Sequence, residues 1–162
     1  MKNLAANLAA FVLAVALDGL AKTLAENRLE FANPAPVLGN FFRLTLGYNT
    51  GVAFGLFANG GSWPLVVSGL IIAALAAWLV QVIRSGELPS IPGWATGMIL
   101  GGAAGNFLDR LPDGRVTDFL DFGLGSVRWP AFKLADSFIV VGAALLLWIS
   151  LMSQHSKQDQ PS

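Results

Sequence analysis

Residues 63–83 read WPLVVSGLIIAALAAWLVQVI, a run without an ionisable side chain. A helix needs about 20 predominantly apolar residues to cross the hydrocarbon core of a bilayer. We therefore expect this run to span a membrane. Three further stretches approach the same length and composition, at residues 4–25, 92–108 and 134–152. Together they predict an all-α membrane protein with four transmembrane helices.

The overall composition supports this class of protein. Of the 162 residues, 54% are hydrophobic and 12% are charged, and the mean hydropathy is +0.61. Soluble domains carry about 25% charged residues. A chain of this length has room for one helical bundle. We place that single membrane domain at residues 1–152 and a polar tail at residues 153–162.

Missing residue types narrow the chemistry. The net charge is zero, which gives no support for binding nucleic acid. The chain has no cysteine, so disulfides, thiolate metal sites and a cysteine nucleophile are excluded. Its one histidine, His155, lies in the polar tail, which argues against a Ser-His-Asp triad or a histidine metal site. We expect neither a metal nor an organic cofactor.

The N-terminal stretch has a second interpretation. A lysine, an apolar run and the sequence Ala14-Val15-Ala16 are typical of a cleavable signal peptide. The helical apolar pattern, however, continues beyond this point to residue 25. The same stretch also contains Asp18 and Lys22, which a discarded leader does not need. We prefer a retained transmembrane helix.

The third stretch is short and rich in glycine. Its glycines recur every four residues, at Gly93, Gly97, Gly101 and Gly105. This spacing places them on one helix face, where small residues let a neighbouring membrane helix approach closely. We interpret Gly93 and Gly97 as packing residues.

The connections between the spans differ in character. In residues 26–62, Leu44, Leu46 and Tyr48 alternate with polar or small residues, which predicts a short strand in a small flap. Residues 109–133 are rich in charge. Basic residues near membrane ends favour the cytoplasm. More of them lie beside the long connections than beside the termini, so their count alone places those connections in the cytoplasm.

Asp118 and Asp136 lie near the junction of the third and fourth spans. A charged carboxylate at the edge of the hydrocarbon layer is costly, so its presence there indicates a working site. Two close carboxylates can share one proton and perform acid–base chemistry. This pair is the leading candidate for catalysis.

Five motifs surround these two residues in a fixed order. They read DGLAK at 18–22, NTGVAF at 49–54, GGAAGNFLDR at 101–110, VTDF at 116–119 and FKLAD at 132–136. In this order the motifs resemble those of the lipoprotein signal peptidases, the membrane aspartyl peptidases also called signal peptidase II. The third motif is long and specific, whereas each of the others is weak by itself.

The resemblance implies that Asp118 and Asp136 form the catalytic pair. Enzymes of this family cut a diacylglyceryl-modified prolipoprotein before its lipidated cysteine, and the mechanism needs no metal. One aspartate, ionised, takes a proton from the attacking water. The other, protonated, hydrogen-bonds the scissile carbonyl oxygen and helps to protonate the leaving amine. The implied site is membrane-embedded and acts on lipid-modified substrate.

The resemblance also implies supporting roles. Asn106 and Arg110 match a polar pair that orients the substrate backbone, and Asn49 matches an asparagine in the covering flap. Asp18 and Lys22 match a first-helix pair that braces the structure. Phe54 is expected to help close the groove.

Several of these residues have plainer interpretations. Asn106 fits an interhelical hydrogen-bond anchor. Asp109 and Asp113 fit ordinary interfacial charges paired with neighbouring arginines. Asp121, close to Asp118 in sequence, is a competing partner for Asp136.

The sequence departs from the family pattern at two positions. Gly19 replaces a usual glutamine, which costs up to about 1 kcal/mol in helix propensity. Lys133 replaces the asparagine three residues before the second catalytic aspartate. A nearby ammonium favours ionised carboxylates, which would deplete the acid form of the pair. Alternatively, Lys133 extends toward the lipid headgroups and away from the site.

Three functions remain in competition. The first is an aspartic endopeptidase that processes prolipoproteins. The second is a catalytically impaired homologue that binds lipopeptides or lipopeptide antibiotics without cleavage. The third is a small transporter in which Asp18 or Asp118 relays protons. The motif order favours the first.

The family resemblance also overrides the charge count for orientation. It implies a multi-pass protein of the bacterial inner membrane, with cytoplasmic termini and an active site near the periplasmic or extracytoplasmic face. The expected partners are the prolipoprotein substrate and membrane lipids, whose tails lie against the apolar helices. A four-helix bundle with an enclosed site does not require a second copy, so we expect a monomer.

Overall fold

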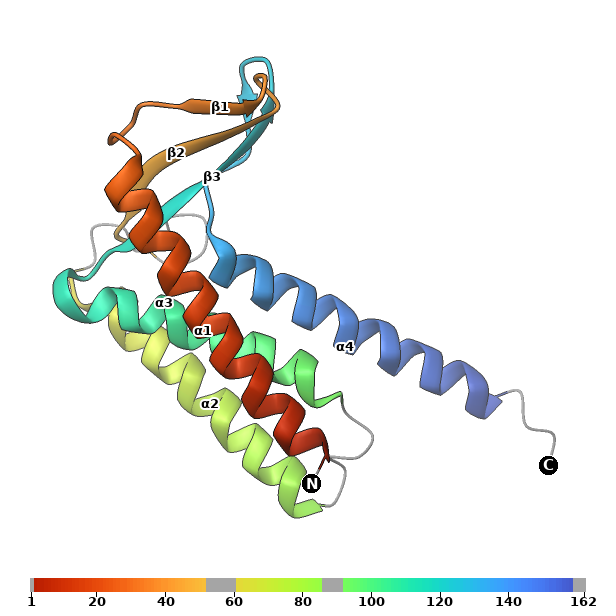
Figure 1. Ribbon diagram of the computed structural model, residues 1–162. Helices are drawn as coiled ribbons and strands as arrows, with labels where there is room; N and C mark the ends of the chain where they lie inside the picture. Colours follow the sequence, from red (N-terminus) through yellow and green to blue (C-terminus); the bar gives the residue numbers. More distant parts are fainter. Residues whose placement is uncertain (1, 52–60, 86–91, 159–162) are drawn as a thin grey trace.

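The computed structural model describes residues 2–51, 61–85 and 92–158. These residues form four helices and a small sheet. Figure 1 shows the sheet joined to one end of the helices. The helices are α1 (Lys2–Arg28), α2 (Trp63–Ser85), α3 (Gly93–Asp113) and α4 (Leu134–Gln158). The strands are β1 (Ala35–Leu38), β2 (Phe42–Asn49), β3 (Val116–Leu124) and β4 (Val127–Arg128).

Each predicted apolar stretch lies within one of these helices, except that α3 begins one residue after the predicted start at Pro92. The largest differences are at two helix ends: α4 continues six residues beyond the predicted boundary at Met152, and α3 continues five residues beyond the predicted boundary at Leu108. Gly114 then ends the helix with a left-handed φ of 76°, and its N–H bonds the carbonyl of Arg110. The extension places Asp109 and Arg110 on a rigid helix and not in a loop.

Close packing of α3 against its neighbours depends on glycine. A Cβ atom on Gly97 or Gly101 would clash with the α1 backbone and with Ala10 or Ala14. Next to this contact, Asn7 donates a buried hydrogen bond of 2.5 Å to Thr96. The predicted packing role of Gly97 is therefore confirmed.

The sheet is antiparallel, with strand order β1-β2-β3-β4. The alternating residues Leu44, Leu46 and Tyr48 lie in β2, as predicted. The sequence did not predict β3, which runs through the charged connection and carries the first candidate aspartate. Between β2 and β3 the register shifts, and Gly47 pairs with Asp118. The flap is thus a larger sheet than expected.

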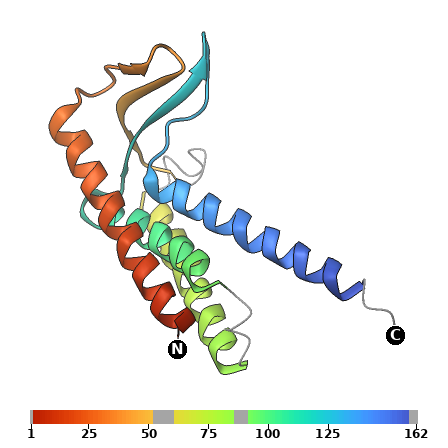
Figure 2. The ribbon, with the colours of Figure 1, turned by 45° about the vertical axis from the view of Figure 1, so that its right-hand side comes forward.

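Large apolar side chains remain exposed along the helices. Val12 on α1, Leu70 on α2 and Trp148 on α4 are 59%, 64% and 66% exposed. In the described part of the chain, two helical segments are long and apolar enough to cross a membrane, Leu4–Arg28 and Trp63–Gln81. A shorter apolar segment covers Leu134–Ile149 of α4. Figure 2 shows α4 diverging from the other helices as it leaves the sheet.

Candidate active site

Asp118 and Asp136 belong to two different elements, but both of their carboxylates contact the ammonium of Lys133. Asp118 lies in β3, and Asp136 lies in the first turn of α4. The ammonium of Lys133 bridges them, at 2.5 Å from Oδ1 of Asp118 and 3.0 Å from Oδ2 of Asp136. The structure therefore brings the predicted pair together around a cation.

Lys133 does not extend toward the headgroups, so that alternative is wrong. The residue is 3% exposed. Burial by itself lowers the pKa of Lys133, but the carboxylates of Asp136 and Asp118 more than reverse this and raise the pKa above its usual value. Lys133 is thus a buried, charged bridge.

The two aspartates differ in their surroundings. The Asp118 side chain is 8% exposed, whereas that of Asp136 is 35% exposed. Burial raises the pKa of Asp118, although the nearby Lys133 ammonium and a hydrogen bond with Asn49 oppose the shift. The structure therefore makes the pair unequal, with a buried member that favours its protonated form and a more accessible member.

The polar residues of α3 and β2 connect this pair to its surroundings. Asn106 donates a 2.9 Å hydrogen bond to Oδ1 of Asp136. Arg110 donates to the backbone carbonyl of Asn106 at 2.9 Å and to that of Gly51. The side-chain oxygen of Asn49 accepts a 2.8 Å bond from the Gly51 N–H. These contacts tie the end of β2 to α3 and to the first turn of α4.

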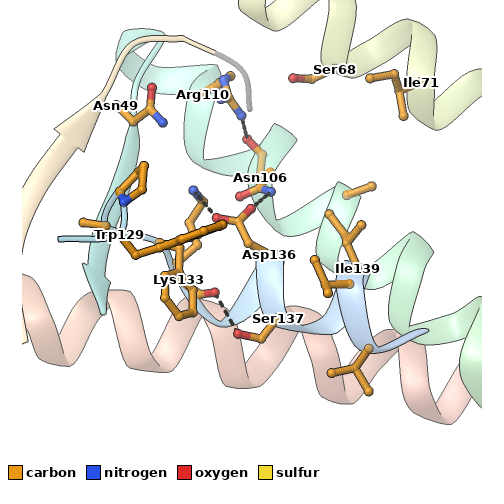
Figure 3. A pocket seen from close by; sticks show the side chains of 16 residues that line it. Asn49, Ser68, Ile71, Asn106, Arg110, Trp129, Lys133, Asp136, Ser137 and Ile139 are labelled. Atoms are coloured by element: carbon orange, nitrogen blue, oxygen red, sulfur yellow. Dashed lines mark hydrogen bonds and ion pairs between the residues drawn. The ribbon is translucent and has the colours of Figure 1, made fainter. Parts of the chain in front are cut away.

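An apolar cavity of about 650 Å³ opens beside Asp136. Its lining comes from the end of β2, from α2, α3 and α4 and from the segment before α4, and includes Asn49, Ser68, Ile71, Trp129, Ile139 and Val140. Figure 3 shows Asp136 projecting toward Lys133 and Asn106 within this lining. Asp118 is not among the lining residues. Phe54, expected to close the groove, lies outside the described residues.

Asp121 was a competing partner for Asp136, and that alternative is wrong. Its carboxylate accepts hydrogen bonds from Arg43, Arg128 and Thr45 within the sheet. Burial by itself raises the pKa of Asp121, but these bonds more than compensate and lower it. Asp121 therefore holds the strands together.

Asp18 and Lys22 do not line the cavity beside Asp136. Lys22 pairs with Asp18 at 2.6 Å and with Asp109 at 3.1 Å. The bracing interpretation of Asp18 and Lys22 fits these contacts. The plain interfacial interpretation of Asp109 does not, since Asp109 also accepts the backbone N–H of Thr117 at 2.8 Å. Sequence reasoning missed this role, although Asp109 stands in the most specific of the five motifs.

The described residues contain no group of three or more histidine, cysteine, aspartate or glutamate side chains that could hold a metal ion. What the arrangement offers is proton transfer. A protonated carboxyl can donate a hydrogen bond to a carbonyl oxygen, while an ionised one accepts a proton from water. The site therefore has the groups for acid–base hydrolysis next to an apolar cavity.

Comparison with known proteins agrees with this geometry. A family model described as signal peptidase (SPase) II matches residues 10–152. The lipoprotein signal peptidase of Polynucleobacter necessarius is 39% identical over 156 residues, covering 94% of this chain and 93% of the relative. That of Aeromonas hydrophila is 38% identical over 151 residues, covering 93% and 90%.

Solved structures show the same fold. One bacterial membrane enzyme superposes with a TM-score of 0.79 at 24% identity, covering 96% of this chain and 93% of the other. A second has a TM-score of 0.74 at 26% identity, covering 90% and 91%. The family model and the curated relatives each extend over most of the sequence. The chain therefore belongs to the signal peptidase II family of aspartic-type membrane proteases.

Proposed function

We propose that this protein removes the signal peptide from diacylglyceryl-modified prolipoproteins, cutting before the lipidated cysteine, with Asp118 and Asp136 as its catalytic pair. One observation carries the assignment of the pair. Their carboxylates come from separate elements, β3 and α4, yet both contact the buried ammonium of Lys133. Family membership supplies the reaction class, and the apolar cavity beside Asp136 suits a substrate that carries acyl chains.

The unequal surroundings of the two aspartates suggest their roles. Asp136, the more exposed, is the base that takes a proton from water as the water oxygen bonds to the scissile carbonyl carbon. Asp118, whose pKa is raised by burial, holds the acid proton and donates a hydrogen bond to the carbonyl oxygen. When the C–N bond breaks, the leaving amine receives a proton from the pair.

The surrounding polar groups keep this geometry. Asn106 orients the Asp136 carboxylate through its 2.9 Å bond. Arg110 fixes Asn106 and the backbone at Gly51, where a substrate strand would pass. Asn49 holds the same turn and bonds Asp118. We infer that these residues position the reacting groups and the substrate backbone without taking part in bond exchange.

The same proposal includes the arrangement in the membrane. All four helices cross the bacterial inner membrane, with the sheet and the active site at the periplasmic or extracytoplasmic face and the termini in the cytoplasm. In support, apolar side chains are exposed on α1, α2 and α4, and the sheet packs at one end of the helices (Figure 1). Membrane lipids cover these faces, and the monomer is the working unit.

The test is cleavage of a diacylglyceryl-modified prolipoprotein by the purified, detergent-solubilised protein, followed by gel shift. The parent is expected to cleave, and Asp118→Asn is expected to lose this activity. Asp113→Asn is the matched control, because Asp113 is a 44% exposed carboxylate of α3 outside the site. Activity retained by Asp118→Asn would contradict the assignment of the pair.

One other outcome would support a different function. If the parent fails to cleave while Lys133→Asn cleaves, the protein is a catalytically impaired homologue that binds lipopeptides or lipopeptide antibiotics. The observation behind this alternative is the ion pair between Lys133 and Asp118, which favours the ionised form of a carboxyl that must carry a proton. If neither form cleaves, the proposed site is wrong.

A further inference from the structure

A second buried charge cluster lies where α1 packs against α3. Its centre is Lys22, whose ammonium contacts Oδ2 of Asp18 at 2.6 Å and Oδ2 of Asp109 at 3.1 Å. The Lys22 and Asp18 side chains are 5% and 1% exposed. Removing charged groups from water is costly, and pairing them often does no more than offset that cost. A buried cluster of this kind is therefore expected to serve a purpose other than stability. Its remaining contacts indicate what that purpose is.

One end of the cluster holds the backbone beside Asp136. Oδ1 of Asp18 accepts a buried 2.7 Å hydrogen bond from the N–H of Ala135, the residue directly before Asp136. This N–H lies in the first turn of α4, where backbone donors have no partner within the helix. A Cβ atom on Gly105 would lie 2.8 Å from the Asp18 carboxylate, so glycine there leaves room for this contact.

The other end holds the backbone beside Asp118. Oδ2 of Asp109 accepts a 2.8 Å hydrogen bond from the N–H of Thr117, the residue directly before Asp118. The hydroxyl of Thr117 also donates to Glu26 of α1 at 2.6 Å. The residue before each candidate catalytic aspartate therefore donates its backbone N–H to a carboxylate of the same cluster. The two carboxylates share one ammonium.

We propose that Asp18, Lys22 and Asp109 form a positioning bridge that sets the distance between the Asp118 and Asp136 carboxylates. The two aspartates come from β3 and α4, and the bridge connects the backbones of both to one point on α1. Charge-assisted hydrogen bonds to backbone N–H groups are short and directional, which suits them to fixing position. This inference rests on the proposed function, because it assigns a role within that reaction.

A positioning role and a purely stabilising role predict different kinetic effects when the bridge is lost. If it only stabilised the fold, its loss would reduce the amount of folded enzyme and leave each folded molecule equally active. If it positions the pair, its loss lowers kcat of the folded enzyme. The substrate cavity is lined by other residues, so KM stays nearly constant. A misplacement of about 1 Å in a catalytic group costs about 100-fold in rate.

The test compares substitutions at Asp109, the more accessible end of the bridge, at 23% side-chain exposure. Asp109→Ala is expected to lower kcat by about 100-fold with KM within about two-fold of the parent. Asp109→Asn keeps an acceptor oxygen for the Thr117 N–H and should recover part of the loss. Monodisperse protein is used throughout, and folded protein is quantified by its thermal unfolding amplitude.

Two controls separate positioning from stability. Asp113→Ala removes a carboxylate of the same helix that also accepts a backbone N–H, from Arg115 at 3.2 Å, but is exposed and does not line the cavity beside Asp136. Gly97→Ala disturbs the α1–α3 contact away from the bridge. Neither should change kcat per folded enzyme. If Asp109→Ala lowers Tm as much as Gly97→Ala does but keeps full kcat, the bridge only stabilises the fold.

A double variant tests whether the bridge acts as one unit. Breaking either end already interrupts the connection between the two backbones through Lys22, so Asp18→Asn combined with Asp109→Asn should cost less than the product of the two single effects. Independent, multiplicative effects would overturn the proposal. A parent chain that does not cleave would overturn the proposed function and this inference together, whereas an active parent with unaffected bridge variants would overturn only the inference.

Discussion

The ammonium of Lys133 lies 2.5 Å from Oδ1 of Asp118, and both side chains are less than one-tenth exposed. This contact places a fixed positive charge against the carboxyl that we propose as the acid. Burial favours the protonated form of Asp118, and Lys133 favours the ionised form. In the proposed mechanism, the balance between these two effects sets the pH range in which Asp118 can act as the acid.

The first prediction concerns this balance. In Lys133→Asn the burial of Asp118 acts without the opposing ammonium, so the pKa of Asp118 rises further. The acid form then persists to higher pH. In the profile of kcat/KM against pH, the alkaline limb therefore shifts to higher pH. The profile is measured for parent, Lys133→Asn and Lys133→Gln. If the alkaline limb stays at the same pH or shifts to lower pH in both neutral variants, Asp118 is not the acid.

The second prediction compares the two aspartates. Loss of a positioned acid or base costs about 10²–10⁴-fold in rate. Asp118→Asn and Asp136→Asn should each lower the cleavage rate by about 10²–10⁴-fold or more. The double variant should be no worse than the slower single one, because the pair works as one unit. Single-turnover cleavage assays provide the measurement, and multiplicative losses would contradict a shared mechanism.

The third prediction concerns the stability of the sheet. The pKa of Asp121 is lowered in the folded protein, so its bonds to Arg43 and Arg128 stabilise the fold above the ordinary aspartate pKa. This stabilisation is lost as the pH falls through the lower, folded-state value. Asp121→Asn should cost about 1–3 kcal/mol at neutral pH. It should also flatten the acid decline of Tm; a decline as steep as in the parent would contradict the assignment.

The fourth prediction concerns helix packing. Gly101→Ala adds a methyl group against Ala14 and the backbone of Phe11, where no space exists. Overpacking of this kind typically costs about 1–3 kcal/mol, so Tm should fall. Gly19→Ala is the matched control, because nothing lies within 4 Å of its added Cβ and alanine favours the helix. Equal effects of the two substitutions would show that the glycine contact is not required.

Local sequence properties predicted much of this fold. The apolar stretches within α1, α2, α3 and α4, the packing role of Gly97 and the strand through Leu46 follow from composition and periodicity. These features depend on residues close together in the chain. Strand β3 was missed because residues 109–133 were described only as a connection rich in charge, with Asp121 among the charged residues. They are stable in a sheet only because partners from elsewhere in the chain neutralise them.

The order of the motifs in the sequence by itself indicated the family and the two candidate aspartates. The tertiary structure alone decided that Lys133 points inward and that Asp109 holds the backbone before Asp118. It also decided that Asp18 holds the backbone before Asp136, from a position 117 residues away from Ala135. The apolar helices follow from local composition, because the cost of placing each residue in lipid depends on that residue alone, whereas these contacts arise only when β3 and α4 have packed against α1 and α3.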